Sequence, residues 1–165
     1  MVVEVDDAGW GDLIGGAFIV MRRTEPDERF TGEVPLSAFQ GPAFQEKAYF
    51  SGVMAAVQKG IGVLKVDKSE RLRICTGYIL SGVRAALVNE GYTVEPARIT
   101  GATQEYAEEQ FVMSLVRLGV GSFSEVKAMR SFNGFLRWVL RDLPRRERLV
   151  KTGWKSWPRL REGAR

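Results

Sequence analysis

The sequence predicts an α/β protein with a mixed sheet, in which three antiparallel strands precede strands that alternate with helices lying on both faces of the sheet. Three observations support this prediction. Three apolar segments joined by short turns fill the first 36 residues, and apolar residues then recur at helical spacing between later strand-like segments. Hydrophobic residues make up 45% of the 165 residues, enough for one globular domain.

The N-terminal part predicts an antiparallel meander. Segments 2–7 and 17–21 are rich in Val, Ile and Phe, and a weaker strand is expected over 29–36. A glycine-rich connection separates the first two segments, and a turn at 24–28 contains Pro and acidic residues. Short connections of this kind favour antiparallel neighbours.

The remainder predicts helices alternating with strands. Strands are expected over 72–76 and 92–100, with Pro96 placing the second at an edge or a bulge. Helices are expected over 42–59, 79–89, 102–118 and 124–143. Pro144 ends the last helix, so we expect a domain of residues 1–143 followed by an irregular basic extension, residues 144–165.

Charge is distributed unevenly along the chain. Residues 130–165 hold eleven basic and three acidic residues, a net charge of +8, whereas the thirteen basic and seventeen acidic residues before them give −4. Three of the four tryptophans also lie in this segment. Cations interleaved with aromatic rings suit single-stranded nucleic acid, although tryptophans of a solvated basic helix can equally pack on the core. The predicted nucleic-acid contacts are Arg145, Arg146, Arg148, Lys151, Trp154, Lys155 and Trp157.

Composition excludes several kinds of chemistry. The chain has no histidine, which rules out an imidazole base and a Ser-His-Asp triad. The single cysteine, Cys75, precludes an intramolecular disulfide and suits a reducing compartment. The chain lacks a long apolar run and a basic, apolar N-terminal leader, so we expect a cytoplasmic protein without membrane contact. Carboxylates, Lys, Tyr, Ser or Thr side chains, and oxygen-ligated metals such as Mg²⁺ or Mn²⁺, remain for catalysis.

Two adjacent carboxylates end the first predicted strand. Asp6 and Asp7 repel one another and lose hydration there, and a divalent cation would compensate both. Gly9 and Gly11 leave the main chain beside them bare, so that its N–H groups can face a phosphate. The alternative is that the acids only form a turn, since Asp and Gly are common turn residues.

The stretch Asp6-Asp7-Ala8-Gly9-Trp10-Gly11, followed by Gly15 and an apolar strand, resembles the opening of type 2 ribonucleases H. This resemblance implies a ribonuclease H-like fold and two-metal hydrolysis of phosphodiesters in RNA, DNA or a hybrid, with Mg²⁺ or Mn²⁺. It also implies that Gly9, Trp10 and Gly11 contact the substrate strand. The spacing of Gly9, Gly11 and Gly15 matches a dinucleotide-binding loop less well, because a strand and not a helix follows.

Further acids must converge on this site if it is catalytic. Glu46 precedes Phe50 by four residues, which places it on the buried face of the expected helix. The alternative is that Glu46 only occupies the first turn of that helix, where the helix dipole stabilises an acid. Glu108 has the same relation to Val112 in the helix expected over 102–118. In the family, acids from the first helix and from a late helix reach the site. We therefore predict Asp6, Asp7 and Glu46 as metal ligands, with Glu108 as a fourth catalytic acid.

The fourth predicted strand departs from the family pattern. It reads Leu72-Arg73-Ile74-Cys75-Thr76 and lacks the carboxylate that catalytic members carry at its end, and Cys75 is expected to be a small buried hydrophobe. This departure keeps a second interpretation open. The chain would then be a catalytically inactive ribonuclease H-like module that binds nucleic acid, or a scaffold that binds a protein partner.

Overall fold

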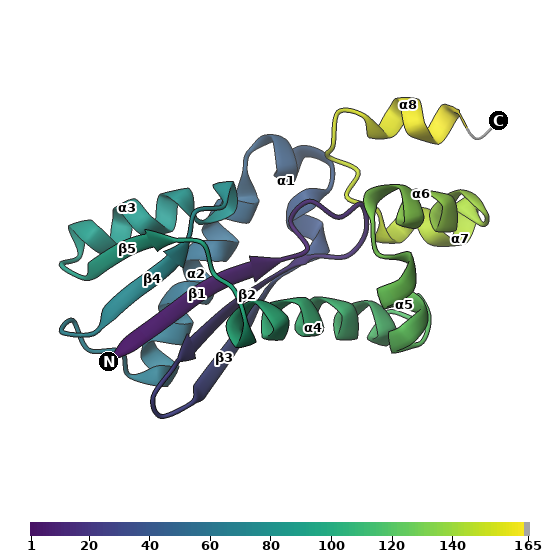
Figure 1. The fold of residues 1–165 in the computed structure, drawn as a ribbon. Helices are drawn as coiled ribbons and strands as arrows, with labels where there is room; N and C mark the ends of the chain where they lie inside the picture. The colour runs from purple at the N-terminus through teal and green to yellow at the C-terminus, as the bar shows by residue number, and fades with distance from the viewer. Residues whose placement is uncertain (164–165) are drawn as a thin grey trace.

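The computed structural model describes residues 1–163, which form a five-stranded mixed sheet with helices packed against both faces (Figure 1). The strands lie in the order β3-β2-β1-β4-β5. Their bounds are β1 Val2–Ala8, β2 Ala17–Arg23, β3 Glu28–Val34, β4 Arg71–Cys75 and β5 Thr93–Ala97. The α-helices are α1 Gly41–Gln45, α2 Ala48–Leu64, α3 Ser81–Asn89, α4 Ala102–Arg117, α5 Phe123–Met129, α6 Phe132–Leu140, α7 Leu143–Arg146 and α8 Trp157–Glu162, with short 3-10 turns Leu36–Phe39, Tyr78–Leu80 and Glu147–Leu149.

The pairing confirms a meander followed by crossovers. β2 runs antiparallel to both β1 and β3, whereas β4 is parallel to β1 and β5 is parallel to β4. β1 is therefore the central strand, and its last residues lie next to the end of β4. Pro96 lies in β5, which pairs with β4 only, in agreement with its predicted edge position.

Side chains alternate along β1 and supply two separate cores. Val3 and Val5 join the core beneath α2 and α3, and Ala8 joins the core on the other face, beneath α4. Val20, which pairs with Asp6, also belongs to the second core. Asp6 thus enters a largely apolar layer at the end of the central strand.

The helix expected over 42–59 is two helices. α1 ends at Gln45, and Lys47 adopts a left-handed conformation (φ 56°) before α2 begins at Ala48. The break allows Phe44 to pack against Tyr49 and Trp154, contacts that a continuous helix would not supply. α2 then continues past the expected end, to Leu64.

The helix expected over 124–143 is also divided. Ser131 starts α6, with its side-chain oxygen accepting a hydrogen bond from the amide of Gly134 (2.9 Å). A Cβ atom at Gly134 would lie only 1.9 Å from the carbonyl oxygen of Met129, so glycine is required where the chain turns between α5 and α6. The cap at Ser131 therefore starts a new helix within the range that the sequence predicted as one.

The C-terminal segment packs into the second core instead of forming an irregular tail. Leu149, Val150 and Trp157 are buried with the residues beneath α4, and Val150 forms a bridge with Ile14. In Figure 1 this segment passes beside the connection that follows β1 before it reaches α8. Among residues 1–163, no helix has both the length and the apolar character needed to span a bilayer.

Candidate metal centre

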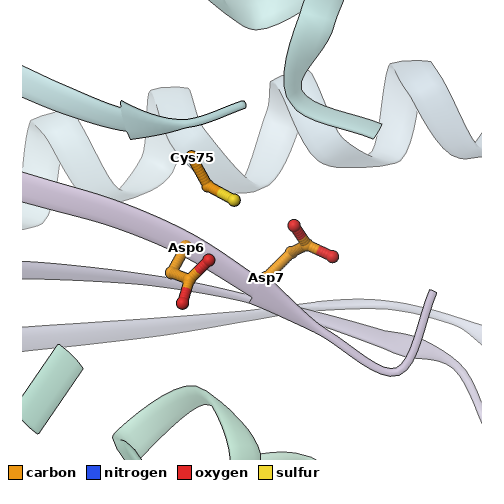
Figure 2. Close-up of side chains that lie close together, drawn as sticks. All are labelled: Asp6, Asp7 and Cys75. Carbon is orange, nitrogen blue, oxygen red and sulfur yellow. The ribbon is translucent and has the colours of Figure 1, made fainter. Parts of the chain in front are cut away.

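Asp6, Asp7 and Cys75 form a compact group of ligand atoms at the end of the central strand. One carboxylate oxygen from each aspartate and the Cys75 sulfur all lie within 4.8 Å of one another. Figure 2 shows the two aspartates on β1, with the cysteine facing them from β4. Asp6 is 5% exposed, and Asp7 and Cys75 are partly exposed.

Strand register and a small residue bring these groups together. Glu4 pairs with Arg73 in the parallel ladder, so continuing the register places Cys75 level with Asp6. As the next residue along β1, Asp7 would ordinarily point to the face of the sheet opposite Asp6. Because β4 ends at Cys75, however, β4 does not cover the side chain of Asp7. Gly77 completes the opening, since a Cβ atom there would lie 3.2 Å from Asp7 Oδ1.

Arg84 holds the chain that follows β4. Its guanidinium donates hydrogen bonds to the carbonyl oxygens of Cys75 (2.5 Å) and Gly77 (3.2 Å). These bonds fix the turn that carries the thiol and that leaves room for Asp7. Arg84 is thus a positioning residue of the group, and its helical sequence context contained no signal for this role.

In the part of the chain that the structure describes, the aspartate pair differs from the other shielded acids in having no cationic partner. Glu4, Asp12 and Glu70 form ion pairs with Arg73 (2.8 Å), Arg130 (3.2 Å) and Arg23 (2.8 Å), respectively. Within residues 1–163, no lysine or arginine forms an ion pair with Asp6 or Asp7. A buried carboxylate without compensation is unfavourable, so this pair is the natural place for a bound cation.

The pKa values of Asp6, Asp7 and Cys75 also reflect negative charge that no nearby cation compensates. Burial raises the pKa of Asp6, and burial together with the charge of Asp6 raises the pKa of Asp7 to about 6. Burial also raises the pKa of the Cys75 thiol to about 11, so the thiol is neutral at pH 7. Two carboxylates can ligate a divalent cation, and the thiol can join them only by losing its proton; a cation placed between the three groups would lower their pKa values.

Replacing Asp7 with asparagine is expected to stabilise the metal-free protein at neutral pH. Because the native pKa lies above that of the unfolded chain, the native state binds the proton more tightly, and stability is lost as pH rises from about 4 to about 6. Asp7→Asn removes this loss, and the gain at pH 7.5 should be about 1–2 kcal/mol. Thermal unfolding in EDTA between pH 4 and 8 measures it, and a variant less stable than wild type at pH 7.5 would contradict it.

Neither predicted partner acid reaches the group. Glu46 is exposed at the end of α1, because the helix break at Lys47 removes it from the buried stripe that placed it in the site. Glu108 lies on α4, where it is 41% exposed and forms an ion pair with Arg130. The expectation that both acids converge on Asp6 is wrong, because it assumed one continuous helix for Glu46 and did not anticipate a cation beside Glu108.

The two glycines after the acid pair have different surroundings. Gly9 (φ 91°) is buried, and a Cβ atom there would lie 2.5 Å from the ring of Phe111, so its role is close packing on α4 and not the predicted contact with a strand. Gly11 is exposed, with open space around it. Only Gly11 therefore presents the bare main chain that the sequence predicted.

An aromatic cluster adjoins the acid pair. Trp10, half-buried, contacts the rings of Tyr78 (5.8 Å) and Trp154 (5.3 Å). Tyr78 directly follows Gly77, the residue next to Asp7 Oδ1, and is 51% exposed, so one ring of the cluster is open to solvent. The whole cluster consists of Trp10, Phe39, Phe44, Tyr49, Phe50, Tyr78 and Trp154.

The basic C-terminal residues separate into buried and exposed sets. Lys151 is fully buried and Trp157 is 3% exposed, so burial excludes the predicted direct contact of either with nucleic acid. Trp154 is half-buried in the aromatic cluster, and Arg146 lies over the ring of Trp138 (4.1 Å). Arg145, Arg148 and Lys155 are exposed as predicted.

A second exposed basic feature, absent from the predicted nucleic-acid contacts, lies at the C-terminal end of α6, where Arg141 is the residue that follows the helix. Arg137 and Arg141 are exposed one helical turn apart, and with Trp138 they line a hollow of about 230 Å³. No acid among residues 1–163 forms an ion pair with either arginine. The spacing of four residues within a helix was the signal that could have identified them.

No protein-family model matches the chain, and no curated protein matches its sequence significantly. The assignments above therefore rest on the structure.

Proposed function

We propose that this protein is a ribonuclease H-like phosphodiesterase that acts on nucleic acid and depends on a divalent cation held by Asp6 and Asp7. The observation that carries the proposal is the acid pair itself, with Asp6 buried and Asp7 partly exposed at the end of the central strand and no cationic partner for either among residues 1–163. The sheet supports it, because an antiparallel meander followed by parallel strands is the arrangement that the resemblance implied. Mg²⁺ or Mn²⁺ bound there would activate water and stabilise the leaving oxygen.

The proposal involves one cation and not two. Two carboxylates reach the site, while Glu46 and Glu108 lie elsewhere, so the described residues supply too few anionic ligands for a pair of metal ions. Cys75 completes the group as a neutral thiol at pH 7. A metal that tolerates sulfur, such as Mn²⁺, suits this donor set better than Mg²⁺.

An exposed aromatic ring and exposed cations support a nucleic acid as the substrate. Tyr78, which follows Gly77 in the chain, offers an open ring on which an unpaired base can stack. Arg137, Arg141, Arg148 and Lys155 are exposed and free of ion pairs within the described chain, so they remain available to phosphates.

A titration of Mn²⁺ by calorimetry tests the proposal. Wild-type protein is expected to bind with a Kd between micromolar and millimolar, and Asp6→Asn should lose this binding. Asp12→Asn is the matched control, because Asp12 lies in the adjacent turn but already has Arg130 as its partner. Failure of wild-type protein to bind Mn²⁺, or equal binding by Asp6→Asn, would overturn the proposal.

The second candidate is a catalytically inactive module that binds nucleic acid, and the thiol of Cys75 in place of a carboxylate favours it. Labelled single strands and hybrids, incubated with the Mn²⁺-loaded protein, distinguish the two. Cleavage by wild type that Asp6→Asn abolishes supports the phosphodiesterase. Salt-sensitive binding that leaves the strands intact supports the module.

A further inference from the structure

Lys151 has surroundings unlike those of any other lysine in the described chain. Its side chain is fully buried, and Nζ donates hydrogen bonds to the carbonyl oxygens of Gly9 (2.8 Å), Asp12 (2.8 Å) and Ile14 (3.3 Å). The rings of Phe39 and Phe111 lie 5.2 Å and 6.0 Å from the same nitrogen. The three N–H donors of an ammonium group match three carbonyl acceptors, so the hydrogen-bonding capacity of this cation is satisfied by main chain alone.

All three carbonyls belong to the turn that follows Asp7. The amide of Asp12 donates to the carbonyl of Gly9 (3.2 Å), which therefore serves both the turn and the ammonium. Carbonyl oxygens that converge on one point repel each other unless a positive charge lies between them. Burial lowers the pKa of Lys151 to about 7, so the ammonium form that supplies this charge and stabilises this turn conformation prevails below neutral pH.

The main chain around Lys151 reinforces the same attachment. The amide of Lys151 donates to the carbonyl of Leu13 (2.8 Å), and the amide of Gly15 donates to the carbonyl of Leu149 (2.9 Å). These hydrogen bonds thus connect the turn to residues 149–151, which lie more than 130 residues later in the sequence. Gly9, at one end of the attachment, is two residues from Asp7.

We propose that Lys151 is a positioning residue for the acid pair, acting as an internal cation that holds the turn of residues 9–16 and through it the orientation of Asp7. This inference rests on the proposed function for its consequence at the metal site. The attachment of the turn stands on the contacts of Lys151 and is tested separately. The same contacts reassign Lys151 from a nucleic-acid contact to the interior of the protein.

The experiment compares wild type with Lys151→Met, which keeps an unbranched side chain and removes the donors. Val126→Ala, in the same core but on α5, is the control for a general loss of stability. Hydrogen exchange measures the amides of residues 9–16, and Mn²⁺ titration measures the metal site. We expect Lys151→Met to speed exchange in the turn at least tenfold and to weaken Mn²⁺ binding about tenfold, with neither change in Val126→Ala.

Chemical rescue covers the case in which Lys151→Met does not fold. Lys151→Ala leaves space beside the three carbonyls, and methylammonium, but not the larger choline, should restore both turn protection and Mn²⁺ affinity. The positioning role is overturned if Lys151→Met leaves both the amide exchange of residues 9–16 and the Mn²⁺ affinity unchanged. It is also overturned if methylammonium restores neither the turn protection nor the Mn²⁺ affinity of Lys151→Ala. Wild-type protein that binds no Mn²⁺ overturns the proposed function instead, and the exchange rates still decide whether Lys151 holds the turn.

Discussion

Replacing Arg23 with methionine is expected to lower the free energy of unfolding by about 3–5 kcal/mol, the cost of leaving a buried charge without its partner. Arg23 is 7% exposed and Glu70 is 2% exposed. The guanidinium donates to both oxygens of Glu70 (2.8 and 3.0 Å) and to the carbonyl of Leu64 (2.7 Å). The substitution leaves the buried Glu70 carboxylate without its guanidinium partner.

Urea denaturation measures this effect, and two further variants isolate its cause. Arg29→Met removes a guanidinium whose ion pair with Asp27 is exposed on both sides, and it should cost less than about 1 kcal/mol. The double variant Arg23→Met/Glu70→Leu removes both buried charges and should recover most of the loss. A double variant as unstable as Arg23→Met would show that the stranded carboxylate is not the cause.

The same pair makes a prediction about pH. Hydrogen bonding to Arg23 lowers the pKa of Glu70, so the contribution of the pair is present above the unfolded pKa of about 4.3 and is lost as pH falls through the lower native value. In Arg23→Met the stranded carboxylate is relieved by protonation. The difference in stability between the two proteins should therefore shrink as pH falls below about 4.

Replacing Cys75 with aspartate is the substitution expected to change metal binding most. The register places position 75 level with Asp6, where a third carboxylate would join the two already present. An added anionic ligand strengthens binding of a hard cation, and we expect the Kd for Mn²⁺ to fall roughly tenfold or more. The gain for Mg²⁺ should be larger than for Mn²⁺, because Mg²⁺ disfavours sulfur.

Cys75→Asp should also make folding depend on the cation. Without metal, three shielded carboxylates repel one another, so the melting temperature should fall below that of wild type and recover on addition of Mn²⁺. Cys75→Ser is the control, since it changes the ligand atom without adding charge. Equal Mn²⁺ affinity in Cys75→Asp and Cys75→Ser would show that position 75 does not face the cation.

This variant also bears on the two candidate functions. If the phosphodiesterase lacks only an anionic ligand at position 75, Cys75→Asp should cleave labelled strands faster than wild type. If the chain is a binding module, tighter metal binding should leave the strands intact. The measurement thus separates metal affinity from catalysis in a single protein.

The sequence alone was sufficient for the order of the strands and for the position of the acid pair. Periodicity and turn residues are local, so the meander, the edge position of β5 and the placement of Asp6 and Asp7 at the end of a strand were all predictable. The apolar residues that flank Asp6 and Asp7 in the sequence indicated that the two carboxylates would be shielded from water. No long-range contact was needed for these conclusions.

Only the tertiary structure decided which charges have partners. Glu46 lies outside the predicted site because a single left-handed residue, Lys47, ends the helix that would have placed it there. Glu108 forms an ion pair with Arg130 and does not reach the acid pair. The same is true of Lys151, whose charge predicted an exposed contact. Its actual acceptors lie 137–142 residues earlier in the chain, and nothing local to Lys151 encodes a cage of carbonyl oxygens that forms only when the C-terminal segment packs beside the turn after β1.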